Sequence, residues 1–150
     1  MATIGDLYHS KHQADGSHSV ISLSQTVTVL DATRVMNSHG IGAVLVMEGL
    51  RPVGIFTERD VLRRIVAAGK RPEETLLREV MTEDPVCCSV EDDVDCVAET
   101  MRTRRIRHLP VIDVEGYVVG MISIGDINAF RSASYEMALH QIESYVYSRN

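Results

Sequence analysis

The sequence has no tryptophan and few aromatic residues of any kind. Phe, Tyr and Trp make up 5% of its 150 residues, which argues against a wide stacking platform for single-stranded nucleic acid or carbohydrate. It also lacks any apolar run of about 18 residues and any basic start followed by an apolar run, so neither a membrane span nor a secretory signal is expected. The net charge is −6 and no run of five or more basic residues occurs, which disfavours nucleic acid as a partner.

Cysteine is scarce. The chain has three, Cys87, Cys88 and Cys96, without a Cys-x-x-Cys spacing. An odd number suits a reducing compartment better than a disulfide framework, so we expect a cytoplasmic protein. Cys87 and Cys88 are expected to be small buried residues, with a redox role as the alternative, and further metal ligands at a fitting spacing are absent.

What the sequence does contain is an internal repeat. Met36–Val46 aligns with Met101–Val111 at an offset of 65 residues. Each copy has the pattern of a strand, a helix, two strands joined by a glycine turn, and a second helix. A unit of about 60 residues is too small to be comfortable alone. We therefore expect an α/β (α+β) fold of two pseudo-symmetric βαββα modules packed sheet to sheet, with a ligand cleft between them.

This pattern divides the chain into four parts. They are an N-terminal lead segment (1–18), a first module (19–78), a second module (79–131) and a C-terminal amphipathic helix (132–150). The C-terminal helix is expected either to pack on its own domain or to lie at a homodimer seam. His9, His12 and His18 fall in a polar stretch that predicts a loop and not a metal cluster.

The strongest local signal is a Gly-apolar-apolar-Thr/Ser-x-x-Asp motif that occurs once in each copy. It runs from Gly54 to Asp60 and from Gly120 to Asp126. One interpretation is a capping box at a helix start. The other is a ligand site, because free N–H groups at a helix start bind phosphate and a carboxylate one turn in can hold the ribose hydroxyls. Phosphate and ribose together indicate a nucleotide.

Signals for enzymatic chemistry are weak. Gly40-Ile41-Gly42 resembles the start of a dinucleotide fingerprint, but Leu45 takes the place of the third glycine and the segment runs from helix to strand, the reverse of the required order. Neither a nucleophile elbow, nor His-Glu-x-x-His, nor a P-loop is present in the sequence. We therefore expect no enzymatic activity, and an NAD-dependent enzyme is the weakest alternative.

The duplicated residues resemble a tandem pair of CBS (cystathionine-β-synthase) domains, a Bateman module, of the small stand-alone bacterial type. The resemblance covers residues 19–131 and is carried by Met36–Val46, Gly54–Asp60, Val80–Thr82, Ile106–Val111 and Gly120–Asp126. It implies an energy or redox sensor that binds an adenine nucleotide in the cleft and does no chemistry on it. AMP is the first choice, with ADP, ATP, NAD(H) or S-adenosylmethionine as alternatives. A homodimer and a separate regulated protein are the other partners implied, and no cofactor is required.

The resemblance also implies roles for individual residues. Asp60 and Asp126 would hold ribose, and Thr57 and Ser123 would lie on the phosphate side. The adenine slots and pocket walls would be formed by Val20, Ile21, Ser22, Ala43, Val44, Val86, Cys87, Cys88, His108, Leu109 and Pro110.

The two copies are not identical around the motif. Arg59 and Arg107 are candidate phosphate partners, although Arg59 also fits a solvated helix position. Gly125 stands in copy two where copy one has Arg59, so we expect the two sites to differ in phosphate preference. Val44 in copy one replaces the Leu-Pro type of strand start common in the family, which leaves the shape of that pocket open. The alternative to a sensor is a ligand-free dimeric scaffold whose motifs serve only as helix caps.

Overall fold

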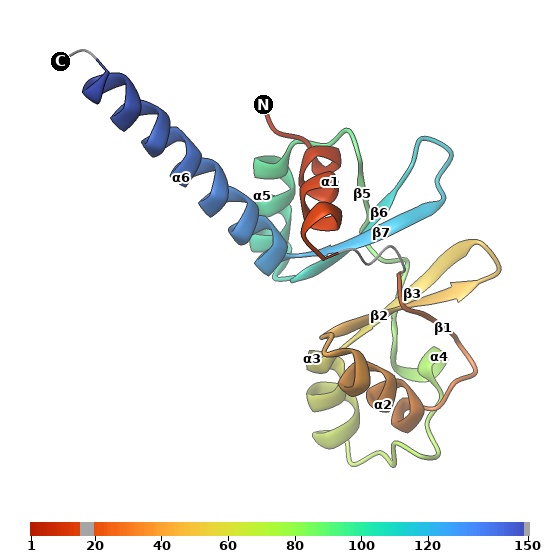
Figure 1. The fold of residues 1–150 in the computed structure, drawn as a ribbon. Helices are drawn as coiled ribbons and strands as arrows, with labels where there is room; N and C mark the ends of the chain where they lie inside the picture. The colour runs from red at the N-terminus through yellow and green to blue at the C-terminus, as the bar shows by residue number, and fades with distance from the viewer. Residues whose placement is uncertain (16–19, 149–150) are drawn as a thin grey trace. The chain divides into compact units, whose positions relative to one another are not determined.

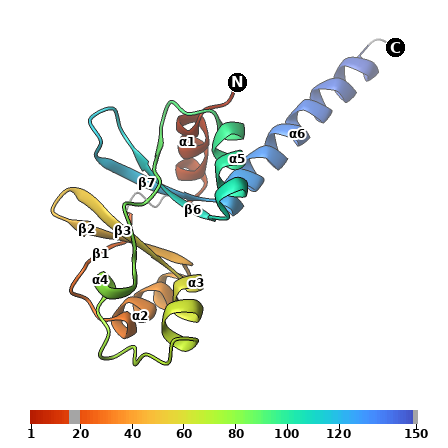
Figure 2. The same cartoon turned by 180° about the vertical axis from the view of Figure 1, so that it is seen from behind.

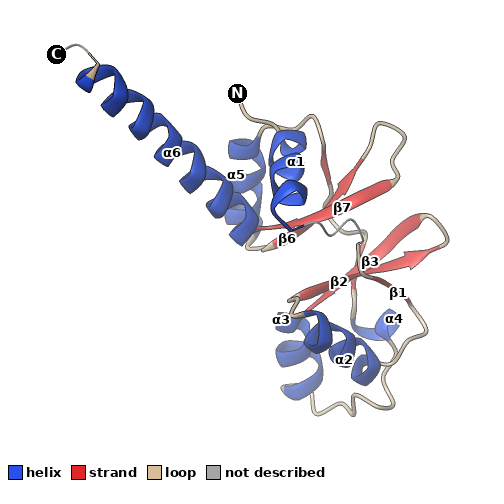
Figure 3. Ribbon diagram, in the orientation of Figure 1, coloured by secondary structure: helices blue, strands red, loops and turns tan. Residues whose placement is uncertain are grey.

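The computed structural model describes residues 1–15 and 20–148, and these residues form two β-sheets with helices (Figures 1 and 3). One sheet has four strands in the order β1-β2-β3-β4, and the other has three in the order β5-β6-β7. The chain divides into two compact units. One contains residues 19–89 and 109–121, and the other contains residues 1–18, 90–108 and 122–150. Each unit therefore gathers stretches that are far apart in the sequence.

The first copy of the repeat follows the predicted order of strand, helix, strand, strand and helix. Its elements are β1 (Ser22–Ser24), α2 (Val29–His39), β2 (Ala43–Glu48), β3 (Arg51–Thr57), α3 (Glu58–Asp60), the π-helical η1 (Val61–Val66), α4 (Leu77–Val80) and β4 (Thr82–Glu83). Thr28 caps the start of helix α2, its hydroxyl accepting a hydrogen bond from Asp31 N, and Gly40 in the left-handed conformation (φ 61°) caps its end. Such caps satisfy backbone groups that a helix leaves unpaired at its ends.

The four-stranded sheet has a parallel and two antiparallel pairings. Strand β1 runs parallel to β2, β2 and β3 form the predicted hairpin, and β4 pairs antiparallel with β3. The core of this copy is aliphatic apart from Phe56, as the low aromatic content requires. Its buried members are Val29, Ala32, Met36, Val44, Val46, Phe56, Ile65, Leu77, Val80 and Met81.

The second copy repeats the same order. Its elements are β5 (Cys88–Ser89), α5 (Val94–Arg104), β6 (His108–Ile112), β7 (Val118–Ser123) and α6 (Ile124–Tyr147). Strand β5 runs parallel to β6, as β1 does to β2. The two βαββα copies and the mixed α/β class are thus confirmed.

The N-terminal segment is a helix, so the prediction of a loop around His9 and His12 is wrong; His18 lies outside the described residues. Helix α1 (Ile4–Asp15) buries Ile4 and Leu7, which are 0% and 1% exposed and lie three residues apart on one helix face. Backbone hydrogen bonds from Ile4 N to Asp92 O and from Gly5 N to Val90 O, both 2.8 Å, attach it next to α5. The overlooked signal is the hydroxyl-x-x-carboxylate pattern of Thr3 and Asp6 at the start of this helix.

Helix α6 is continuous with the second copy, so a separate helix beginning at residue 132 is not formed. It runs without a break from Ile124 to Tyr147, and its buried residue is Ile127. In Figures 1 and 2 its C-terminal half extends beyond α1 and α5, the helices of its own unit. Residues 132–148 are all exposed, so the prediction that this segment packs on its own domain is wrong. Within residues 1–15 and 20–148, no helix is long and apolar enough to cross a membrane.

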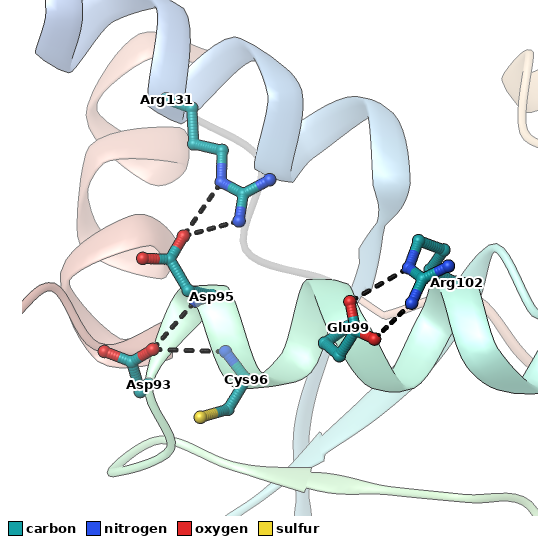
Figure 4. A network of polar contacts seen from close by, with 6 residues as sticks. All are labelled: Asp93, Asp95, Cys96, Glu99, Arg102 and Arg131. Carbon is teal, nitrogen blue, oxygen red and sulfur yellow. Dashed lines mark hydrogen bonds and ion pairs between the residues drawn. The ribbon is translucent and has the colours of Figure 1, made fainter.

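Polar contacts fix the base of α6 against α5 (Figure 4). The guanidinium of Arg131 on α6 donates hydrogen bonds to Asp95 Oδ1, with Nε at 3.1 Å. The neighbouring Asp93 caps α5 by accepting from Asp95 N at 2.9 Å and Cys96 N at 3.1 Å. A carboxylate at a helix start is also favoured by the helix dipole. The cap and the ion pair together hold α5 and the first turns of α6 in place.

Candidate functional site

The first motif ends in a complete capping box. Asp60 Oδ2 accepts hydrogen bonds from Thr57 N at 2.9 Å and from the Thr57 hydroxyl at 3.2 Å. The same hydroxyl accepts from Asp60 N at 3.4 Å. The second oxygen, Oδ1, lies 3.7 Å from Arg64 Nε one turn along the chain. Asp60 is only 8% exposed, and its carboxylate is therefore held in one orientation by its own cap.

The second motif has the same box with a different partner. Asp126 Oδ2 accepts from Ser123 N at 2.8 Å, and Ser123 Oγ accepts from Asp126 N at 3.1 Å. Lys11 Nζ on α1 lies 3.0 Å from the same Oδ2. The structural interpretation of the motif is thus confirmed in both copies, because each hydroxyl and each carboxylate caps a helix start.

Each motif is also tied to the strand entrance of its own copy. Glu58 N donates to Gly42 O at 3.0 Å, and Ile124 N donates to Arg107 O at 2.9 Å. These are equivalent positions of the repeat. This backbone hydrogen bond places the helix start beside the beginning of β2 or β6. The carboxylate therefore has the same position relative to its strand in both copies.

The chemistry available at each motif is hydrogen-bond acceptance by an anchored carboxylate. A carboxylate has about four lone-pair sites, and the cap of the first motif uses the two on Oδ2 of Asp60. The sites on Oδ1 are left to face Arg64 and any hydroxyl that approaches. A vicinal diol, such as that of ribose, donates two hydrogen bonds and matches this arrangement.

The structure brings together the predicted strand residues of the first copy. Ala43 on β2 pairs directly with Thr57 on β3. Ser22 on β1 pairs with Leu45, whose N–H donates to Ile21 O at 3.3 Å. Val20 and Ile21 are half-buried, Ser22 is exposed, and Ala43 and Val44 are buried. The predicted wall residues therefore occupy adjacent strands, and Ala43 connects them to the motif.

The predicted residues of the second copy fall in both units. Cys88 on β5 pairs with Val111, and its Sγ donates to Pro110 O at 3.6 Å. These residues, with Val86, Cys87 and Leu109, belong to the unit of the first copy, whereas Arg107, His108, Ser123 and Asp126 belong to the other.

Burial raises the pKa of the Cys87 thiol, which disfavours the thiolate that redox chemistry needs. His108 is half-buried.

The ion-pair partners of the two carboxylates were not predicted. Arg59 and Arg107 are both exposed, while the cations recorded at the carboxylates are Arg64 and Lys11. Arg64 could have been found, because it lies four residues after Asp60 on a helical segment. Lys11 carries no local signal, since 115 residues separate it from Asp126.

The Thr3-x-x-Asp6 pattern of α1 repeats the same chemistry outside the two copies. Thr3 N donates to Asp6 Oδ2 at 2.9 Å, and Asp6 N donates to Thr3 Oγ1 at 3.2 Å. The bonds from the Thr3 backbone and hydroxyl lower the pKa of Asp6. The pattern alone is therefore a helix-start signal, and it becomes a candidate ligand site only in the setting of the repeat.

A separate groove lies on the helical side of the first copy. It has a volume of about 570 Å³ and is lined by Thr33, Met36, Asn37, Gly40, Ile41, Glu58, Val61 and Leu62. Neither Thr57 nor Asp60 lines it, so it is not the predicted nucleotide site. Among the described residues, no group of three or more His, Cys, Asp or Glu side chains is placed to hold a metal ion.

Comparison with known sequences gives consistent matches over the repeat. The family profile described as CBS domain matches residues 16–67 and again residues 77–132. The mitochondrial CBS domain-containing protein CBSX3 of Arabidopsis thaliana is 35% identical, over 96% of this chain and 71% of its own length. An uncharacterised protein of Methanopyrus kandleri is 34% identical over 72% of this chain, and the match spans 56% of that relative.

Solved structures give the same result. A protein with CBS domains from Burkholderia ambifaria superposes with a TM-score of 0.81 at 32% identity, covering 88% of this chain and 95% of that one. The CBS domain protein PAE2072 of Pyrobaculum aerophilum, solved in complex with AMP, superposes with a TM-score of 0.75 at 26% identity, covering 92% and 99%.

Proposed function

Since the chain belongs to the CBS-domain family and carries two such domains, we propose that it is a regulatory protein that binds an adenine nucleotide through its Thr57–Asp60 and Ser123–Asp126 motifs. The observation that carries this proposal is the anchored carboxylate of each motif. Asp60 and Asp126 are held by their own caps, so a ribose diol would bind without reordering the backbone. The AMP complex of the related Pyrobaculum aerophilum protein supports the ligand class.

The nucleotide acts as a signal and not as a substrate. AMP is the first candidate, and ATP or NAD(H) shares the adenosine part that the motifs would recognise. Neither motif contains a nucleophile paired with a general base, and the polar groups at the two carboxylates are a hydroxyl, backbone N–H groups and a cation. The chain therefore responds to ligand by a change of conformation or association, and a separate protein recognises the changed state.

The chain acts as a homodimer joined through α6. This helix exposes seven large apolar side chains, each between 59% and 78% exposed: Tyr135, Met137, Leu139, Ile142, Tyr145, Val146 and Tyr147. Among them, Tyr135, Leu139, Ile142 and Val146 follow the three- and four-residue spacing of a helix–helix seam. A second copy of the same helix would cover this surface with matching side chains.

A dimeric scaffold without ligand is the second candidate function. The complete capping boxes of both motifs favour it, because they account for the hydroxyl and the carboxylate of each motif without a nucleotide. The exposed apolar surface of α6 favours it as well. The two candidates differ in what the carboxylates do when a nucleotide is added.

Thermal melting separates them. The purified protein is melted with AMP, ADP, ATP, NAD, NADH and S-adenosylmethionine, because a ligand at about 100 times its dissociation constant stabilises by about 2.7 kcal/mol. A selective rise in Tm that the Asp60→Ala, Asp126→Ala variant loses supports the sensor. Asp93→Ala is the matched control, since it removes a helix-cap carboxylate outside the motifs and lowers the starting Tm without removing the ligand-induced rise. No rise with any ligand favours the scaffold.

The cytoplasmic location stays a prediction. It rests on three cysteines that form no disulfide bond within the part of the chain that the structure describes, with Cys88 buried, Cys87 half-buried and Cys96 exposed. An exposed free thiol is kept reduced in the cytoplasm.

A further inference from the structure

Helix α1 brings a cation to the second motif. Lys11 Nζ donates to Asp126 Oδ2 at 3.0 Å, and the two side chains are 32% and 23% exposed. Both residues belong to the same compact unit, which contains residues 1–18 and 122–150. The sequence has only two lysines, Lys11 and Lys70. Because the pair is partly buried, solvent and salt screen its attraction less than they would screen that of a fully exposed pair.

Lys11 is the second donor to the Oδ2 atom of Asp126, a place that the hydroxyl of Thr57 takes at Asp60 in the first copy. Asp60 Oδ2 receives the N–H and the O–H of Thr57. Asp126 Oδ2 receives the N–H of Ser123 and an N–H of Lys11. Among the described residues, Ser123 Oγ takes part only in the bond it accepts from Asp126 N. The proton of the Ser123 hydroxyl is therefore available to a ligand.

Each carboxylate has one cation beside it, Arg64 at Asp60 and Lys11 at Asp126, but the two cations come from different parts of the chain. An unneutralised carboxylate repels a phosphate that is held one turn away. At the second motif the ammonium of Lys11 neutralises Asp126 directly, and Gly125 leaves the position equivalent to Arg59 without charge. A phosphate bound there would have the Ser123 hydroxyl as donor and Lys11 as the nearest recorded cation.

We infer that Lys11, supplied by the N-terminal helix, determines the preference of the second motif for phosphorylated over unphosphorylated adenosine ligands. This inference rests on the proposed nucleotide function and extends it to a residue outside the CBS repeat. Adenosine shares the ribose but has no phosphate, so its binding to Asp126 gains nothing from an added positive charge. AMP carries the anion that Lys11 favours.

Titration calorimetry with AMP and with adenosine tests the inference in the Asp60→Ala variant, in which the measured binding is that of the second motif. Lys11→Met is expected to weaken AMP binding about tenfold, the size of one charge-assisted hydrogen bond, while adenosine binding changes less than about twofold. Lys11→Arg keeps the charge and restores AMP binding. Lys70→Met is the matched control, because it removes the other lysine and leaves both ligands unaffected.

Four outcomes would overturn the inference. Equal losses for AMP and adenosine would mean that Lys11 only positions Asp126. Unchanged AMP binding would remove Lys11 from the site, and tighter binding would make α1 an obstruction. Binding of AMP to the wild type but not to Asp60→Ala would mean that the second motif is not a site. The proposed function itself fails in a different way, when the wild-type protein binds no adenine nucleotide at all.

Discussion

Gly54 lies where β3 pairs with β4, and its missing side chain makes room for Met81. A Cβ at this position would lie 2.9 Å from Met81 Cγ and 3.1 Å from the backbone oxygen of Thr82. Real Cβ atoms almost never approach other heavy atoms so closely, so one of the neighbours would have to move. Glycine is therefore needed in the motif for packing, independently of any ligand.

Gly54→Ala is expected to lower the free energy of unfolding by about 1–3 kcal/mol through overpacking. Urea denaturation measures the loss. Gly125→Ala is the control, because a Cβ there meets only Ser123 Oγ at an ordinary 3.5 Å, and alanine in the first turn of α6 is neutral or stabilising. Equal midpoints for Gly54→Ala and the wild type would show that Met81 moves away without cost.

The three cysteines are expected to differ in reactivity according to their surroundings. Iodoacetamide should label the exposed Cys96 first, the half-buried Cys87 more slowly and the buried Cys88 last, as mass spectrometry of the intact fold would measure. Burial raises the pKa of Cys87, so the folded protein keeps this thiol protonated to a higher pH than the unfolded chain does. Its contribution to stability is complete below the unfolded pKa and is lost as the pH rises.

Cys87 labelled ahead of Cys96 would contradict this order. It would indicate an activated thiolate at Cys87 and would support a redox role for the Cys87-Cys88 pair.

At the scale of the element, α6 is the clearest case of a helix without enough of its own chain to cover it. Its first turns are fixed by Asp126 and by the Arg131–Asp95 pair, and its remaining turns expose Leu139 and Ile142 at 61% and 60%. In proteins most helical stability comes from packing of an apolar face. The second half of α6 therefore depends on another surface.

The double variant Leu139→Glu, Ile142→Glu is expected to abolish the proposed dimer, because it places charge on the apolar surface. Size-exclusion chromatography with light scattering measures the mass, which should fall from that of two chains to that of one. Gln141→Glu adds charge at an exposed polar position of the same helix and should leave the dimer intact. A wild-type protein that runs as a single chain, or a double variant that stays dimeric, would refute the role of α6.

Apolar periodicity was sufficient to predict the elements that bury their own side chains. Val29, Ala32 and Met36 are all buried on α2, and the run Ala43–Val46 is buried throughout as β2. Helix α1 escaped prediction because Ile4 and Leu7 are the buried apolar residues among residues 4–13 and most of the segment is polar. A short helix with so few anchors gives no periodic signal.

The candidate site was predictable in its local part and not in its distant part. Thr57 with Asp60, and Ser123 with Asp126, were recognised because their spacing of three residues is fixed by the helix start. Lys11 was not, because its approach to Asp126 depends on how α1 packs, and no sequence pattern encodes a contact between residues 115 apart. The boundaries of the two predicted modules and the roles of the wall residues stay predictions.

At the scale of the whole molecule, the N-terminal helix belongs to the unit that contains α5 and α6. Its bridge between Thr3 and Asp93 and its backbone bonds to Val90 and Asp92 all point to that unit. Units of this kind open with separate free energies in hydrogen exchange. A substitution that destabilises α1 should therefore speed amide exchange in α5 before it does so in α2.

Leu7→Ala tests this division. Leu7 is 1% exposed, so its truncation is expected to cost about 2–5 kcal/mol and to speed amide exchange across α5 more than across α2. Leu50→Ala is the control, because Leu50 is 71% exposed in the β2–β3 turn and its loss should change neither. Equal acceleration in α2 and α5 would mean that the chain unfolds as a single cooperative body.

The attachment of α1 to residues 90–93 also sets an order of events during biosynthesis. The ribosome completes α1 well before Val90 and Asp92, and at about 5–20 residues per second the delay is on the order of ten seconds. During that interval Ile4 N and Gly5 N lack their acceptors on Asp92 and Val90, while α2, β2 and β3 emerge and are able to close around Phe56. A nascent chain of this protein is therefore expected to pass through a stage with a finished β-hairpin and an α1 that is not yet attached, which is the form that a cotranslational chaperone would meet.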